Sequence, residues 1–280
     1  MNAQREETLR SGPIEEKLHA LRSYLQDRGP MLVAFSGGVD SSFLLAVAKD
    51  VLQERVIALM TVSSSTPPED HEQAIALAKS LKVELLLIAH DELAIPQYAA
   101  NPTNRCYFCK DSLYDICRRE AVRLSIRMIA DGVNVDDLGD YRPGIQAATE
   151  YQILHPLVEA EFTKGEIRQA SRLLGLPTWE KPASPCLSSR IPYGTQITAR
   201  MLSQIAQAEA FIRALGFREL RVRHHATSAR IELHREDLQK ALSPSVISSF
   251  RNELKQQGFT SVLLDLEGYR SGVFNETIQK

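Results

Sequence analysis

Short apolar runs alternate with stretches of helical periodicity along the first two thirds of the chain. The apolar runs predict strands at residues 31–35, 56–62, 83–89, 126–130 and 152–154. Between them, apolar residues recur at helical spacing, which predicts helices at residues 18–25, 42–52, 67–81 and 165–174. Strands that alternate with helices imply a parallel sheet covered on both faces, so we predict an α/β fold with a doubly wound parallel sheet.

A proline-rich segment at residues 181–185 interrupts this pattern. Beyond it, the sequence predicts a helix at 199–215 and two strands of alternating pattern at 220–223 and 229–233. Two further helical stretches and a strand at 261–266 follow. The length of 280 residues exceeds the usual size of one hydrophobic core. We therefore expect two domains, residues 1–180 and residues 181–280, the second a smaller α/β domain.

The first predicted strand is followed at once by Ser36-Gly37-Gly38-Val39-Asp40-Ser41-Ser42 and then by a helix. Two glycines let the backbone approach a polyanion, the start of the helix adds N–H donors, and the serines add hydroxyls. Asp40 can hold the Mg2+ that accompanies nucleotide phosphates. Ligands of open α/β sheets bind beyond the carboxyl ends of the strands, so we expect Asp131 and Gly132, which close the fourth strand, near the same nucleotide. The alternative for the glycine loop is an ordinary turn between strand and helix. The alternative for Asp131 is that it caps a turn.

The charge balance narrows the class of partner. A net charge of -2 and a pI near 6.4 leave no overall basic field, which favours a small substrate over a nucleic acid. The N-terminal residues are charged throughout, with no apolar signal core and no segment long enough to cross a bilayer. We expect a cytoplasmic protein with no membrane and no nucleic-acid partner.

The cysteines form a second candidate site. Cys106 and Cys109 make a C-x-x-C in the predicted loop after the third strand, and Cys186 lies in a later loop, whereas Cys117 reads as a core residue. The pair could be half a zinc site, a redox pair or two ligands of an iron–sulfur cluster. Three thiolates, from Cys106, Cys109 and Cys186, would bind a [4Fe-4S] cluster at all but one iron, which could carry sulfide. Unrelated buried cysteines are the alternative.

Charged residues near these motifs are further candidates. Lys110 follows the cysteine pair and Arg190 lies four residues after Cys186, so either could neutralise phosphate or carboxylate charge, or could be a solvated surface cation. Arg221 and Arg223 alternate on a predicted strand, which puts both guanidinium groups on one face, suited to phosphate recognition.

Taken together, these motifs resemble the LarE family of ATP-dependent sulfur transferases, within the N-type ATP pyrophosphatases that share the Ser-Gly-Gly-x-Asp-Ser pyrophosphate loop (PP-loop) and a HUP-like fold. The resemblance covers about residues 18–275 and rests on residues 36–41, Arg105 to Lys110, Asp131-Gly132, Asp140-Tyr141-Arg142-Pro143-Gly144, Cys186 to Gly194 and Leu264 to Gly272.

The resemblance implies adenylation of the carboxylates of pyridinium-3,5-biscarboxylic acid mononucleotide and their conversion to thiocarboxylates, in the synthesis of the nickel-pincer nucleotide cofactor. It implies ATP and Mg2+ as cofactors, a PP-loop domain followed by a substrate-binding and oligomerisation domain, a homo-oligomer, and other enzymes of the same biosynthesis as partners. It also implies that Glu209 and Arg270 join Arg221 and Arg223 around the substrate.

Two sulfur sources occur in such enzymes. In one form, the cysteine at the position of Cys186 gives up its own sulfur and becomes dehydroalanine; in the other, three cysteines hold a [4Fe-4S] cluster that relays sulfur. The C-x-x-C favours the cluster here. Alternative functions are thiolation of tRNA, which would need a basic surface, amidation as in NAD or GMP synthetase, and nucleotide or iron–sulfur sensing without turnover.

Overall fold

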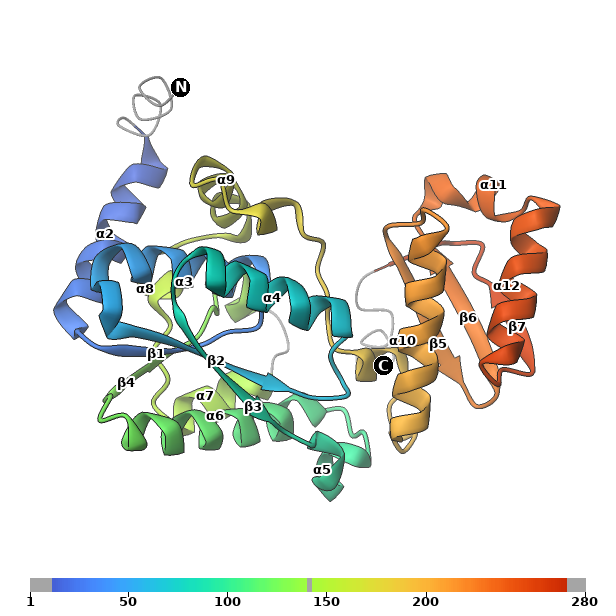
Figure 1. Cartoon of the computed structure of the whole chain (residues 1–280), viewed down its shortest axis with the longest axis horizontal. Helices are drawn as coiled ribbons and strands as arrows, with labels where there is room; N and C mark the ends of the chain where they lie inside the picture. Colours follow the sequence, from blue (N-terminus) through green and yellow to red (C-terminus); the bar gives the residue numbers. More distant parts are fainter. Residues whose placement is uncertain (1–11, 140–142, 271–280) are drawn as a thin grey trace. The chain divides into compact units, whose positions relative to one another are not determined.

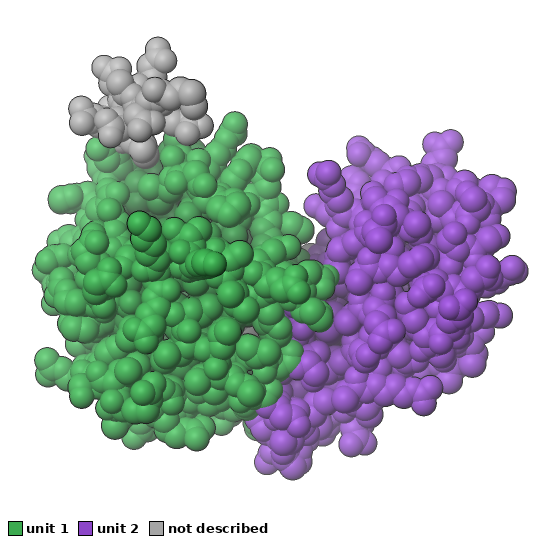
Figure 2. Space-filling view, in the orientation of Figure 1, with its two compact units in different colours: residues 1–63, 68–90, 106–184 green, residues 64–67, 91–105, 185–280 purple. Residues whose placement is uncertain are grey.

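The computed structural model of the protein describes residues 12–139 and 143–270, and the chain divides into two compact units (Figure 2). The first unit comprises residues 1–63, 68–90 and 106–184, and the second comprises residues 64–67, 91–105 and 185–280. The C-terminal part of the second unit thus begins at Pro185, the last residue of the proline-rich segment. Two short segments from the N-terminal half of the sequence also belong to it.

The first unit is built on a parallel sheet, which confirms the predicted α/β fold. Within the described residues its strands have the order β3-β2-β1-β4, and all three pairings are parallel. The bounds are β1 Met31–Ala34, β2 Val56–Val62, β3 Glu84–Ala89 and β4 Met128–Ala130. Residues 152–154, predicted as a fifth strand, contribute only an isolated parallel bridge between Leu154 and Ala130. This segment is too short to form a ladder beyond the edge of the sheet.

Helices cover both faces of this sheet (Figure 1). Helices α2, α3, α4 and α9 lie with one face, and α6 and α7 with the other. The bounds are α2 Pro13–Arg28, η1 Gln53–Arg55, α3 Val39–Leu52, α4 Pro68–Ser80, α6 Arg105–Arg123, η3 Val135–Gly139, α7 Pro143–Glu150, α8 Pro156–Glu159, α9 Lys164–Leu173 and η4 Pro177–Glu180. None of the helices in the described ranges is long and apolar enough to cross a membrane.

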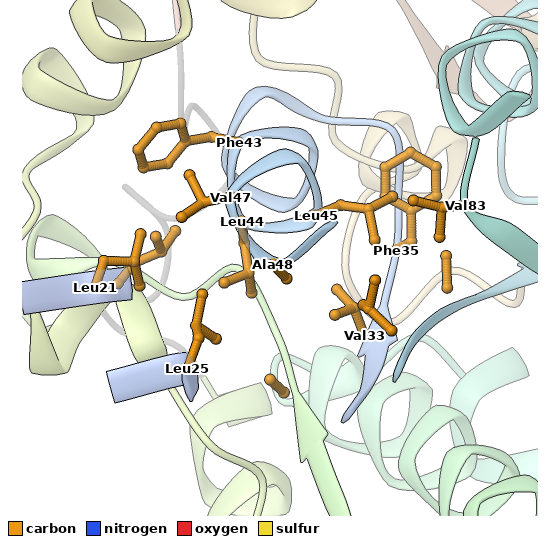
Figure 3. Packing of buried hydrophobic residues seen from close by; sticks show 14 of the residues in the cluster. Leu21, Leu25, Val33, Phe35, Phe43, Leu44, Leu45, Val47, Ala48 and Val83 are labelled. Carbon is orange, nitrogen blue, oxygen red and sulfur yellow. The ribbon is translucent and has the colours of Figure 1, made fainter. Parts of the chain in front are cut away.

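The alternation of side chains along β1 builds the two halves of the core. Met31 and Val33 pack with the α2, α3 and α4 side, whereas Leu32 and Ala34 pack with the α6 and α7 side. All four residues are buried, as expected for a central parallel strand. On the first side, helix α3 contributes Phe43, which lies above Leu44, Val47 and the α2 leucines in Figure 3.

The second unit has its own sheet and core. In the part of the chain that the structure describes, β5 Leu220–His225 pairs antiparallel with β6 Ser228–Leu233, and β6 pairs parallel with β7 Ser261–Leu264. Apolar residues of α10 and α12 pack with this sheet. The remaining bounds are η2 Glu92–Ala94, α5 Pro96–Ala99, η5 Leu187–Arg190, α10 Ala199–Ala214, η6 Arg235–Asp237, α11 Leu238–Ala241 and α12 Pro244–Gln256.

Replacement of Phe43 tests the packing of α3. Its ring is fully buried and meets Phe162 edge to face, with 5.1 Å between ring centroids. We expect Phe43→Ala to reduce the free energy of unfolding by about 3–5 kcal/mol, because it removes a large buried ring and leaves a cavity. Urea denaturation measures this loss. Leu87→Ala, at a position 45% exposed on the edge strand β3, is the control and should cost about 1 kcal/mol or less; equal losses would contradict the prediction.

Candidate active site

The Ser36–Ser42 loop lies at the carboxyl end of β1, where it turns directly into α3. Gly37 adopts a φ of +69°, and a Cβ there would lie 2.5 Å from the Cβ of Ala74. Only glycine therefore fits at this position, both for its backbone conformation and for space. The first turn of α3 begins at Val39 and leaves backbone N–H groups without partners in the helix, as an anion site requires.

The serines of this loop mainly bind the loop itself. The hydroxyls of Ser36 and Ser41 are 3.1 Å apart, and Ser41 also donates to the Gly38 carbonyl at 3.3 Å. The Ser42 hydroxyl is fully buried and has no hydrogen-bond partner among the described residues. The structure thus assigns Ser36 and Ser41 a part in shaping the loop. Direct donation to phosphate by the three serines stays a prediction.

Gly132 brings the end of β4 against the start of α3. A Cβ at Gly132 would lie 2.7 Å from the amide nitrogen of Ser41 and 3.0 Å from its Cα. Backbone therefore packs on backbone here, and any side chain would displace the first turn of α3. The predicted neighbours Asp131-Gly132 and the phosphate loop are brought together in one place.

Asp131, the residue before Gly132, is a buried anchor. Its Oδ2 accepts a hydrogen bond from the Tyr114 hydroxyl at 2.6 Å, and its Oδ1 lies 2.7 Å from Nδ1 of His155. Oδ1 also accepts from the backbone N–H of Val133, as in a turn cap. Burial alone would raise the pKa of Asp131, but His155, Lys110 and Tyr114 outweigh it and hold that pKa below its usual value.

Two lysines that the sequence did not single out also reach the loop. Lys164 forms an ion pair with Asp40, whose other carboxylate oxygen lies 3.4 Å from Nδ2 of Asn134. Lys181 contacts the Gly37 carbonyl at 3.3 Å and pairs with Asp70 at 2.8 Å. The Thr163-x-x-Glu capping box marks the start of α9 in the sequence, but the contact of Lys164 with Asp40 is tertiary and carries no local signal.

The cysteine pair lies in a helix, and the prediction of a loop was wrong. Helix α6 begins at Arg105 because Tyr107 and Tyr114 share the face that packs on the sheet, which extends the helical period back through the pair. Cys106 and Cys109 are therefore one turn apart on the same side, the first exposed and the second partly buried. The buried Cys117 belongs to the core, as expected, and burial raises its pKa to about 12.

Lys110 follows the pair on α6, and its side chain is closely packed. A Cβ at Gly144 would lie 2.8 Å from Cγ of Lys110, and the Lys110 ammonium is 5.4 Å from the centre of the Tyr114 ring. The small residue at the start of α7 thus makes room for the lysine stem. The preceding motif residues, Asp140, Tyr141 and Arg142, lie outside the described residues.

In the second unit, the loop of Cys186 is held by a buried ion pair. Arg190 and Glu209 are both completely buried and bind through two contacts of 2.9 and 3.1 Å. Arg190 also donates to the carbonyls of Pro185 and Cys186. Its guanidinium is thus occupied with the backbone around Cys186, and the direct contact with phosphate or carboxylate expected for Arg190 stays a prediction.

The predicted substrate arginines lie in the same charged network. Arg223 pairs with Glu232 at 2.9 Å and donates to the carbonyl of Ser189, the penultimate residue of η5. Arg221 lies over the ring of Tyr269 at 4.9 Å. Burial and the nearby Arg190 lower the pKa of Arg221. Arg270 is half-exposed and pairs with Glu267 at 2.8 Å.

The candidate residues thus form one group in each unit. The first unit brings the phosphate loop together with Asp131 and Gly132, and the second brings Arg190, Glu209 and the arginine strand together with the Cys186 loop. Cys106 and Cys109 belong to the first unit and Cys186 to the second. In residues 12–139 and 143–270, no three His, Cys, Asp or Glu side chains are grouped so as to hold a metal ion.

Gly132→Ala tests the contact between β4 and α3. The added methyl group would lie 2.7 Å from the Ser41 nitrogen, so the first turn of α3 must shift. We expect the affinity for ATP with Mg2+ to fall about tenfold or more, measured by calorimetric titration, because overpacking of about 1–3 kcal/mol is relieved by distortion of the loop. Gly139→Ala, where a Cβ meets nothing within 4 Å, is the control and should bind like the wild type. Equal affinities of the two variants would contradict this.

Glu209→Gln tests the buried ion pair. Burial alone would raise the pKa of Glu209, but Arg190, Arg213 and Arg221 outweigh it and lower that pKa below its ordinary value. At pH 7 we expect the variant to lose about 3–5 kcal/mol of unfolding free energy, because the buried Arg190 is left without its counter-charge.

The pH dependence of this loss has a definite sign. A carboxyl group with a lowered folded pKa stabilises the fold above its unfolded pKa of about 4.3, and this contribution disappears as the pH falls through the folded pKa. The gap between wild type and Glu209→Gln should therefore be constant from neutral pH down to about 5 and narrow below it. Urea denaturation across this range measures it. The exposed Glu267→Gln should differ from wild type by about 1 kcal/mol or less at every pH.

Comparison with known proteins places this geometry in a family. The NAD synthase family matches residues 14–120. A protein of Synechocystis described as uncharacterized is 45% identical over 267 residues, which is 95% of this chain and 100% of the relative. An uncharacterized protein of Methanocaldococcus jannaschii is 29% identical over 91% of this chain and 98% of the relative. The pyridinium-3,5-bisthiocarboxylic acid mononucleotide synthase of Lactiplantibacillus plantarum is 36% identical over 95% of this chain and 96% of its own length. With that identity over nearly the whole of both chains, and with the phosphate loop at the end of β1, this chain belongs to the LarE family of PP-loop enzymes.

Proposed function

We propose that this protein is an ATP-dependent sulfur transferase that converts the carboxylates of pyridinium-3,5-biscarboxylic acid mononucleotide to thiocarboxylates. The proposal is supported by the 36% identity to the Lactiplantibacillus plantarum synthase over nearly the full length of both chains. It places the protein in nickel-pincer cofactor biosynthesis, where its product would pass to other enzymes of that route.

The observation that carries the proposal is the backbone approach at the phosphate loop. Gly37 and Gly132 remove the side chains that would otherwise fill the space at the carboxyl end of β1. The loop and the first turn of α3 then offer backbone N–H donors to a triphosphate. An ordinary strand-to-helix connection needs neither of these close contacts.

The chemistry needs activation of a carboxylate. A carboxylate resists nucleophiles. Transfer of AMP from ATP onto one of its oxygens makes that oxygen part of a leaving group, and sulfide or a thiolate can then attack the carbonyl carbon and displace AMP. In the reaction, a carboxylate oxygen attacks the α-phosphorus of ATP and pyrophosphate leaves. The loop N–H groups stabilise the negative charge that develops on the pyrophosphate.

Mg2+ fits the donor set of the loop. Mg2+ is commonly held by one or two carboxylates together with substrate phosphates, and Asp40 supplies a partly exposed carboxylate at the start of α3. Mg2+ bound there would neutralise phosphate charge. Lys164, which pairs with Asp40, brings a further positive charge to the same place and would bind a phosphate oxygen once Mg2+ takes the carboxylate.

The substrate would be recognised by the arginines of the second unit. Arg221 and Arg223 both lie on β5. Arg270 is the residue after Tyr269, and the ring of Tyr269 contacts the Arg221 guanidinium. A nucleotide phosphate suits these planar, multiply donating side chains. Glu209 would act by keeping the surrounding arginines in place, since it is completely buried between Arg190 and Arg213.

For sulfur delivery we propose the three cysteines. Thiolates are the donors that iron–sulfur clusters take, and Cys106, Cys109 and Cys186 are all at least partly exposed and form no disulfide. A [4Fe-4S] cluster on these residues would offer one iron for sulfide. The alternative is sacrificial loss of sulfur from Cys186 itself.

One experiment tests both the reaction and the sulfur source. Iron-reconstituted protein is incubated without oxygen with ATP, Mg2+, sulfide and the pyridinium dicarboxylate nucleotide. We expect AMP, pyrophosphate and more than one thiocarboxylate per chain, with no change in the intact mass of the protein. Loss of the mass of hydrogen sulfide from Cys186 in step with product would overturn the cluster and support sacrificial transfer.

The controls separate the remaining readings. Cys117→Ala, on the same helix as the pair but in the core, should keep product formation, whereas Cys106→Ala should abolish multiple turnover. Absence of AMP and pyrophosphate under all conditions would contradict an adenylating enzyme. Salt-sensitive binding of tRNA, with sulfur transferred to it, would instead support tRNA thiolation.

A further inference from the structure

Residues 91–105 contact the Cys186 loop within the second unit. In the sequence they lie between two segments of the first unit, residues 68–90 and 106–184 (Figure 2). Asn101 is completely buried, and its side-chain amide donates to the carbonyls of Pro192 at 2.8 Å and Thr195 at 3.1 Å. The hydroxyl of Tyr98 lies 2.6 Å from that of Ser188.

Arg105 ends this segment and is 3% exposed. Its Nη1 donates to Oδ1 of Asn101 at 2.5 Å and to the Ser188 carbonyl at 3.1 Å. Its guanidinium also lies 5.9 Å from the centre of the Tyr193 ring, within cation–π range. Ser188 comes two residues after Cys186, so a single side chain binds the backbone of the cysteine loop.

The position of Arg105 in the sequence gives this contact its meaning. Cys106 is the next residue, and its Cα lies ~3.8 Å from that of Arg105 across a trans peptide bond. The distance from the Cα of Cys106 to the Ser188 carbonyl therefore cannot exceed the length of one arginine side chain plus one peptide unit. Chain connection alone imposes this limit, however the rest of the first unit is placed.

We propose that Arg105 is a positioning residue that holds the C-x-x-C to the loop of Cys186, so that thiolates from two distant parts of the sequence can bind one iron–sulfur cluster. The guanidinium suits this role because several rigid N–H donors can bind more than one carbonyl-type oxygen at once. Its burial makes those bonds strong relative to exposed ones. The inference rests on the proposed three-cysteine ligand set.

The test uses the metal-free, reduced full-length protein and the thiol cross-linker dibromobimane. Cross-linked peptides are identified by mass spectrometry after proteolysis. In the wild type we expect links from Cys186 to Cys106 or Cys109, beside the link within the pair on α6. The link within the pair does not depend on Arg105, so the ratio of the two kinds of link is measured in every variant.

We expect Arg105→Ala to lower that ratio about tenfold, because charge-assisted hydrogen bonds to the loop are lost. Arg118→Ala is the matched control, an exposed arginine of the same helix, and should keep the wild-type ratio. Circular dichroism checks folding. If Arg105→Ala does not fold, Arg105→Lys decides, since it keeps the charge but not the forked donors and should also lower the ratio.

An unchanged ratio in the folded Arg105 variant, or no link to Cys186 in the wild type, would overturn the proposal. Iron and sulfide bound per chain after reconstitution form the second readout, and Arg105→Ala should bind less of both than Arg118→Ala. Wild-type protein that cross-links as expected but binds no cluster would refute the three-cysteine cluster and leave the positioning role standing. A cluster equally retained in Arg105→Ala would refute the positioning role alone.

Discussion

The site depends on one constraint, the close packing of backbone on backbone where β4 meets α3. A methyl group at Gly132 would lie 2.7 Å from the Ser41 amide nitrogen. The loop before α3 is confined from another side, since a methyl group at Gly37 would lie 2.5 Å from the Cβ of Ala74 on α4. These contacts fix where the first turn of α3 begins and hence where its N–H groups point. Asp131, the residue before Gly132, is held in place by contacts of its carboxylate with the Tyr114 hydroxyl and with Nδ1 of His155. The loop is thus closely packed on both sides, and a loop already held in its binding conformation lowers the entropy cost of holding phosphate.

A second constraint is charge buried in the smaller unit. Glu209 is surrounded by arginines and accepts a hydrogen bond from the backbone of Val222 as well. A buried carboxylate of this kind is tolerated only when its partners satisfy it fully. The result ties α10, β5 and the Cys186 loop to one point. The same group of charges that stabilises the unit thus also sets the positions of the residues proposed to meet the substrate.

Much of this could be predicted from the sequence because the relevant signals are local. Strand β2 was predicted at its observed bounds, and the glycines of the phosphate loop correctly indicate a turn between strand and helix. The cysteine pair was misplaced because a helix that begins with polar residues shows its period only once Tyr114 and Cys117 are seen to pack on the sheet. Lys164 and Lys181 were missed because their contacts with the loop come from residues more than 120 positions away. Burial of Arg190 was equally invisible, since an arginine is usually exposed.

The segment at residues 91–105 also shapes how the protein is made. It leaves the ribosome about ninety residues ahead of the loop it binds, since Asn101 and Pro192 are 91 positions apart. Until that loop is synthesised, the polar side chains of the segment have water as their partner, and the strands and helices on either side can already pack. The smaller unit can thus be completed only after Pro185 and the residues beyond it are synthesised, although residues 91–105, which it also contains, come much earlier. Each unit consists of three separate segments of the sequence. The two units therefore could not have been joined by simple fusion of two genes at the proline-rich segment.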